Sequence, residues 1–210
     1  MEPLSRLTDA PQWLALAAAL GWASGIRLYA AVFLVGLAGY LGLVPLPPGL
    51  HVLQQPALLG VSGSLCLVEF FADKIPYLDT LWDTVHTVIR IPAGAALAAG
   101  ALGADSAAMG WIAALLGGSL AATSHAAKLT TRAAVNTSPE PFSNVAVSLF
   151  EDGFVVFMLW LAATHPVWFA IALAATLVVA VLLLFVLAKF LRVVAQRLHR
   201  FFSQGKRRSS

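Results

Sequence analysis

The stretch PVWFAIALAATLVVAVLLLFVLA, Pro166 to Ala188, contains no charged residue. A helix that crosses a bilayer needs about 20 mostly apolar residues, because the hydrocarbon core is about 30 Å thick. This stretch therefore predicts a transmembrane helix. The whole chain agrees with it: 60% of its 210 residues are hydrophobic and 11% are charged, whereas a soluble domain carries roughly a quarter charged residues. We expect an all-α polytopic membrane protein.

Other apolar segments bring the expected number of spans to about six. They are residues 28–44, 56–73, 76–102, 107–124 and 144–164. Short loops with turn residues separate them. Pro92 predicts a kink or the end of a half-helix in the third, so Pro-interrupted helices are expected. Residues 12–21 are too short to cross alone; a half-span, an interfacial helix or an extension of the first span, broken near GWASG, all fit.

We divide the chain into an N-terminal cytoplasmic segment (1–11), a single transmembrane helical domain (12–188) and a basic cytoplasmic tail (189–210). The tail has no acid, and its basic residues are Lys189, Arg192, Arg197, Arg200, Lys206, Arg207 and Arg208. Such a cluster beside a span is typical of the cytoplasmic side and favours anionic lipid headgroups as partners. No nucleic-acid-binding fold accompanies it, so no nucleic-acid partner is expected. A homo-oligomer is left open.

The tail also predicts the orientation. With the tail inside, counting spans backward puts Lys74, Lys128, Arg132 and Arg27 on the cytoplasmic side, as the positive-inside rule requires. An even number of spans then gives a multi-pass protein of the inner (plasma) membrane with both termini cytoplasmic.

Charged and polar residues recur at helical spacing inside the apolar segments. In EFFADKIPYLDTLWDTVHTVIR, residues 69–90, four of them fall at i, i+4, i+7 and i+11 on one helix face. Insertion of each central Asp, Lys or Arg costs about 2.5–3.5 kcal/mol, so the stripes are expected to face each other or a water-filled cavity. The predicted polar cavity comprises Glu69, Asp73, Asp79, Asp83, His86, Arg90, His125, Lys128, Arg132, Asn144, Ser148, Glu151 and Asp152.

Residues 56–102 and 107–164 predict a repeated helical hairpin. Gly-Ser-Leu occurs in both, at Gly63 and Gly118, and polar residues follow at the same i, i+4, i+7 spacing after a Pro-aromatic pair. In transporters, binding sites often lie at the interface between internal repeats. The alternative is a chance match between segments rich in Ala, Leu and Gly.

Three classes of function fit these residues. The first is a small transporter or channel-like protein with a charged, cytoplasm-facing cavity, in which His86 and His125 are candidates for proton handling. The second is a structural or scaffold protein with a buried ion-pair network. The third is an enzyme acting on a lipid headgroup, with Mg²⁺ held by the acids. No catalytic residue or cofactor is predicted, and metal binding is left open, because nucleophile, phosphate-loop and paired-cysteine motifs are absent from the sequence.

The segments SGIRLY, VEFFADKIPYLDTLWDTVHTVIRIPAGA, GGSLAATSHAAKLTTRAAVN and SLFEDG resemble a family of small bacterial integral membrane proteins known as domain of unknown function 4126. The specific parts are Glu-x-x-x-Asp-Lys-x-Pro-x-x-Asp and His-x-x-Lys-x-x-x-Arg. The resemblance covers residues 12 to 188 and implies a multi-span bacterial membrane protein. It implies no activity.

Overall fold

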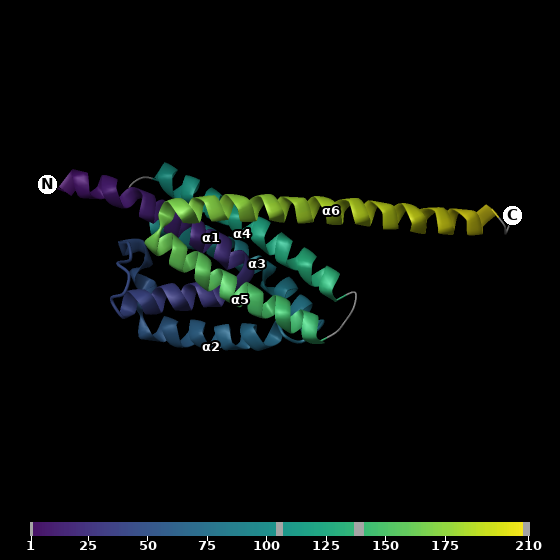
Figure 1. Cartoon of the computed structure of the whole chain (residues 1–210), viewed down its shortest axis with the longest axis horizontal. Coiled ribbons are helices and arrows are strands. Elements are labelled where there is room, and N and C mark those ends of the chain that lie inside the picture. Colours follow the sequence, from purple (N-terminus) through teal and green to yellow (C-terminus); the bar gives the residue numbers. More distant parts are fainter. Residues whose placement is uncertain (1, 104–106, 137–140, 208–210) are drawn as a thin grey trace.

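The computed structural model describes the backbone of residues 2–103, 107–136 and 141–207, and the side chains of residues 11–103, 107–136 and 142–189. Figure 1 shows the helices of this part, among which no strand occurs. They are α1 (Glu2–Tyr40), the 3-10 helix η1 (Pro48–Gln54), α2 (Pro56–Ala72), α3 (Leu78–Leu102), α4 (Ala107–Val135), α5 (Pro141–Thr164) and α6 (Pro166–Arg207). The predicted all-α fold is confirmed.

Helix α1 is interrupted at Arg27, whose φ of −141° and ψ of 73° are not helical. Its first arm, residues 11–26, follows α4: a Cβ on Gly21 would meet Gly117, and one on Gly25 would meet Ser124. Its second arm, residues 28–40, runs back along α2 and ends beside η1. The two arms form a helical hairpin with Arg27 at its tip.

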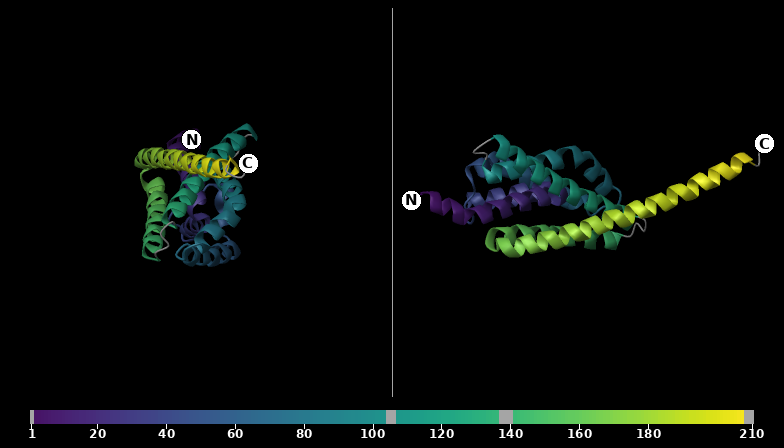
Figure 2. Two further views of the ribbon diagram at one scale, coloured as in Figure 1. Left: turned by 90° about the vertical axis from the view of Figure 1, so that its right-hand side faces the viewer. Right: turned by 90° about the horizontal axis from the view of Figure 1, so that it is seen from above.

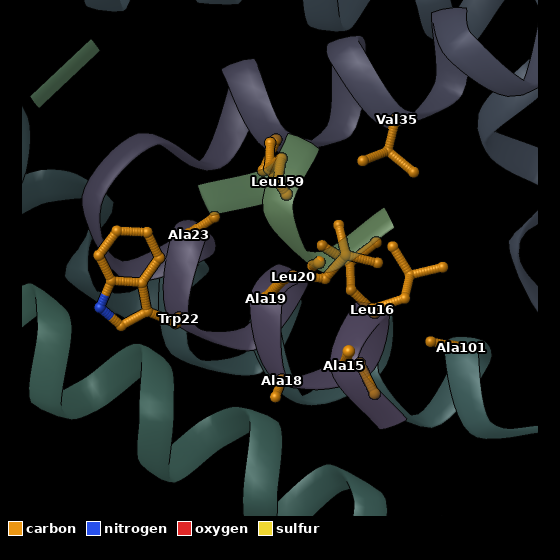
Figure 3. Close-up of a cluster of buried hydrophobic side chains, with 14 of the residues drawn as sticks. Ala15, Leu16, Ala18, Ala19, Leu20, Trp22, Ala23, Val35, Ala101 and Leu159 are labelled. Atoms are coloured by element: carbon orange, nitrogen blue, oxygen red, sulfur yellow. The ribbon is translucent and has the colours of Figure 1, made fainter. Parts of the chain in front are cut away.

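The close-up in Figure 3 shows the consequence of this fold-back. Leu16 of the first arm and Val35 of the second belong to one buried cluster, together with Ala101 of α3 and Leu159 of α5. In a continuous helix these two residues of α1 would lie about 28 Å apart, at 1.5 Å per residue. The hairpin fills the centre of the bundle and contacts every other helix.

Glycine makes this central packing possible, because it lets helix backbones approach each other closely. The Gly21 and Gly117 backbones touch between α1 and α4, and those of Gly49 and Gly100 touch between η1 and α3. Pro92, in contrast, does not end a half-helix, since α3 continues through it to Leu102. That helix ends at Gly103, whose φ of 62° suits glycine.

In the part of the chain that the structure describes, five helices are long and apolar enough to cross a membrane, or six if η1 and α2, bent by 69°, count as one span. The chain is thus an integral, multi-pass membrane protein. Helix α6 is the least buried span, and its C-terminal part projects beyond the bundle in Figure 1 and in the right view of Figure 2. In the basic tail, the side chains of all residues after Lys189 lie outside the described residues.

The two termini lie at opposite ends of the long axis (Figure 1). The side of the membrane on which each terminus lies stays a prediction, and the break in α1 changes the count behind it. The count from sequence begins the first span at residue 28 and leaves residues 12–21 as a half-span, an interfacial helix or an extension of that span. In the structure, the break at Arg27 sends the two arms of α1 in opposite directions. The start of α1 therefore lies at the same end as Tyr40 and Thr164.

Candidate functional site

The predicted polar residues meet at one end of the bundle, around the tip of the α1 hairpin. The charged network defined here contains six acids and five bases, joined by ion pairs within 4.0 Å: Glu69, Asp73, Asp79, Asp83, Glu151, Asp152, Arg27, Lys74, Arg90, Lys128 and Arg132. All but Glu151, Asp152 and Lys74 are almost fully buried. Ion pairing is required here, because an unpaired buried charge is very costly.

Arg27 lies at the centre of the network. Its guanidinium forms an ion pair with Asp73 at the end of α2, and its Nε lies 3.0 Å from Asp152 Oδ1 on α5. The same side chain donates a hydrogen bond of 2.9 Å to Ser148 Oγ. These contacts hold the hairpin tip against both α2 and α5.

The second group of ion pairs joins α2, α3 and α4. Asp83 Oδ1 lies 2.9 Å from both Arg90 Nη2 and Lys128 Nζ. Arg90 also contacts Glu69 Oε1 at 2.6 Å, and Lys128 contacts Asp73 Oδ2 at 2.6 Å. Because Asp73 also pairs with Arg27, the two groups form one continuous network.

Arg132 connects α4 to α5 and to the start of α3. It donates a 2.5 Å hydrogen bond to Asn144 Oδ1 and lies 2.6 Å from Glu151 Oε2. Asp79 is 3.7 Å from the same guanidinium and accepts hydrogen bonds from Asn136 Nδ2. From Asp79 to Arg90 the network extends eleven residues along α3, or about 16 Å.

The break at Arg27 frees carbonyl groups at the end of the first arm of α1, and the network supplies their donors. Gly25 O accepts hydrogen bonds from Arg90 Nη1 and His125 Nδ1, each 3.1 Å long. Ile26 O accepts from Arg90 and from Lys128 Nζ, again at 3.1 Å. Cations at this position also complement the negative end of a helix dipole.

The two predicted histidines have different surroundings. His125 is buried, and its Nε2 lies 2.7 Å from Thr87 Oγ1 on α3. His86 sits at the edge of the network: its Nδ1 donates to Trp82 O, and its ring stacks on the Trp82 indole with a centroid distance of 4.0 Å. Only His125 bonds to other helices of the network through both ring nitrogens.

Two members of the network lie in the turn between α2 and α3, outside the spans. Burial acts to raise the pKa of the Asp73 carboxyl, but the cations of Lys128 and Arg27 together hold that pKa below its ordinary value. Burial lowers the pKa of the Lys74 ammonium, although Asp152, 3.2 Å away, acts in the opposite direction.

A cavity of about 140 Å³ borders the network between α1, α4, α5 and α6. Its walls include Trp22, Ser124, Thr131 and Phe154, and its charged edge is formed by Lys128 and Glu151. At about 30 Å³ per water molecule, it has room for a few waters or one small solute. Among the described residues, no group of three His, Cys, Asp or Glu side chains is placed to hold a metal ion.

The prediction from sequence missed several members of this site. The predicted polar cavity omits Arg27, although an arginine within an apolar segment is itself a signal for a buried partner. The predicted cavity also omits Lys74, yet its ammonium donates hydrogen bonds to Ser148 and Asp152. No sequence pattern pointed to Thr87 or Asn136, because hydroxyl and amide groups are tolerated at many helix positions.

Fold and site together define an all-α integral membrane protein with a charged network buried among its spans. The chain belongs to the family described as domain of unknown function (DUF4126), whose model matches residues 14–186. No curated protein and no solved structure matches the chain.

Proposed function

We propose that this protein is a small membrane transporter that moves a small ion or polar solute, coupled to protons, through the region of the charged network. The observation that carries the proposal is the break in α1. Secondary transporters bind substrates and coupling ions at helices that are interrupted at membrane depth. There, as here, the carbonyl groups freed by the interruption face the binding region. Non-helical backbone at this depth is tolerated only inside protein or beside water.

The extent of the network supports a one-sided access route. Its acids and bases occupy about 16 Å of α3 from the Asp79 end, roughly half of the hydrocarbon thickness. Beyond Arg90 the buried face of α3 becomes apolar, with Gly94, Leu97 and Ala98 packed against α1 and α4. A solute entering from the Asp79 end would reach the hairpin tip and meet a dry, closely packed barrier. In this conformation the ion pairs themselves close the route.

The cavity beside Lys128 and Glu151 offers a small solute a place next to the network. Its volume of about 140 Å³ suits an ion with part of its hydration shell or a solute of a few heavy atoms.

The test is flux in proteoliposomes under an imposed pH gradient, with a pH-sensitive dye inside and a panel of small ions and polar solutes outside. We expect proton movement that depends on one member of the panel and is lost in Asp83→Asn. Thr84→Val is the matched control, because Thr84 lies on the same helix, is exposed, and bonds only Thr80 O within its own helix. Wild-type protein without any flux across the panel would overturn the proposal.

A structural role for the network is the second candidate, favoured by the pairing of every Lys and Arg side chain in it with a carboxylate. Breaking one buried pair typically costs about 3–5 kcal/mol, whereas removing both partners costs far less. If the role is only structural, the Asp83→Asn variant should unfold in detergent at a much lower temperature than wild type. Combining Asp83→Asn with Lys128→Gln should recover part of this loss. The wild-type protein should then carry no flux.

A further inference from the structure

The charged network contains one more acid than it contains lysines and arginines. Six carboxylates and five bases leave a formal charge of −1 with neutral histidines, counted over the residues that the structure describes. The excess acid lies among the three partly exposed members, Glu151, Asp152 and Lys74, since the other four acids and four bases are almost fully buried and balance. A proton on a histidine of the site would compensate the formal charge of the whole network, and the hydrogen bonds there decide which histidine can take it.

Hydrogen bonding around His125 identifies where such a proton fits. Nδ1 faces Gly25 O, which can only accept, so Nδ1 carries a hydrogen. Nε2 faces Thr87 Oγ1 at 2.7 Å, and the same hydroxyl lies 2.9 Å from Asp83 O, which also can only accept. When the His125 ring is neutral, the Thr87 hydroxyl has one hydrogen, which it can donate either to Nε2 or to Asp83 O but not to both.

A second ring proton removes this conflict. Nε2–H then donates to Thr87 Oγ1, the Thr87 hydroxyl donates to Asp83 O, and Nδ1–H keeps its bond to Gly25 O. His86 offers no comparable arrangement, since the bond from its Nδ1 to Trp82 O stays within one turn of α3.

Some of the charges around His125 disfavour a doubly protonated ring, and others favour it. An imidazolium at this position would be buried, with Arg90 Nη1 3.5 Å from Nδ1 and the Lys128 ammonium bonded to the neighbouring Ile26 O, and these cations would repel it. The negative end of the first arm of α1 favours it, because Gly25 O accepts from Nδ1 and cations stabilise this end of a helix dipole. Arg90 pairs with Glu69 and Asp83, and Lys128 pairs with Asp73 and Asp83. These carboxylates reduce the repulsion between the two cations and a protonated His125.

We infer that His125 is the proton-binding residue of the charged network, with Thr87 as the group that accepts the hydrogen bond from its second proton. Binding this proton cancels the excess negative charge and completes the hydrogen bonds between α1, α3 and α4. Its part in transport rests on the proposed function, whereas proton binding itself can be measured without any transport.

The experiment is ¹⁵N NMR of histidine-labelled full-length protein in lipid nanodiscs, titrated from about pH 4 to about pH 9, a range that brackets ordinary imidazole titration. Signals of the five histidines are assigned by single His→Gln variants. We expect His125 to pass from one protonated ring nitrogen to two within this range in folded protein. A His125 ring that stays singly protonated until the protein unfolds would overturn the inference.

Variants of Thr87 separate the role of the hydroxyl from general packing. Thr87→Val, which keeps the shape but removes the acceptor, should weaken proton binding at His125 about tenfold, since a hydrogen bond to a charged group is lost. Thr87→Ser should restore it, and Thr84→Val should change nothing. Equal titration in Thr87→Val and wild type would contradict the assigned role of Thr87.

The two proposals can fail separately. If His125 titrates as expected but liposomes show no flux, the proton site stands and the transport proposal falls. If proton-coupled flux is seen while His125 never gains its second proton, transport stands and the assignment of His125 is wrong.

Discussion

At the scale of single residues, what distinguishes this site is that several buried charges pair with residues of more than one helix. Asp73 contacts Arg27, Lys128 and Arg132, which come from α1 and α4, although Asp73 itself ends α2. The residue spacing in the sequence indicated which side chains share a helix face. It could not indicate which acid meets which base, because those contacts join residues 46 to 59 positions apart.

The lowered pKa of Asp73 predicts a pH dependence of stability. A carboxyl whose pKa is lower in the folded state stabilises the fold above its unfolded pKa of about 3.9, and this contribution is lost as the pH falls through the folded value. We expect the unfolding temperature in detergent to drop between about pH 5 and about pH 3. Asp73→Asn should be less stable at neutral pH and show a shallower drop. Parallel pH curves for the two proteins would contradict this account.

At the scale of elements, the feature that organises the molecule is the break in α1. Composition showed that residues 11–40 are apolar, and a helix through all of them would cross the membrane with length to spare. The fold-back at Arg27 depends instead on groups from other helices, since Arg90, His125 and Lys128 satisfy the carbonyls that the break releases. The predicted duplication of the α2–α3 and α4–α5 hairpins stays a prediction.

Glycine at the tip is expected to be essential for this element. A Cβ at Gly25 would collide with Ser124 Oγ and Ala121 O, so Gly25→Ala should cost about 1–3 kcal/mol through overpacking. Gly60→Ala on α2 is the control, because nothing lies within 4 Å of its added Cβ and alanine favours helix by about 1 kcal/mol. Thermal unfolding in detergent measures both. Equal stability of the two variants would show that the tip is not tightly packed.

At the scale of the whole molecule, the arrangement divides the bundle into two ends. One end holds the charged network and the end of α6, and the other holds the start of α1, η1 and the junction between α5 and α6 (Figure 1). Basic residues gather at the first end, which the positive-inside rule assigns to the cytoplasm. The N-terminus would then face the opposite side.

Cysteine labelling of intact cells tests this topology in a Cys66→Ser background. Gln12→Cys and Thr164→Cys, both exposed, should react with a membrane-impermeant maleimide from outside. Ile75→Cys, 51% exposed in the turn between α2 and α3, should react only after permeabilisation. Protection of Gln12→Cys together with labelling of Thr164→Cys would contradict the hairpin of α1.

The sequence by itself determined the class of protein, most of the spans and the residues that cannot face lipid. Hydropathy and helical spacing are local properties, and the cost of exposing Asp83 or Arg132 to hydrocarbon follows from chemistry alone. Only the tertiary structure decided that α1 turns back at Arg27 and that the opposite charges pair closely around its tip. Those outcomes depend on contacts between helices far apart in the chain, whose geometry no local pattern contains.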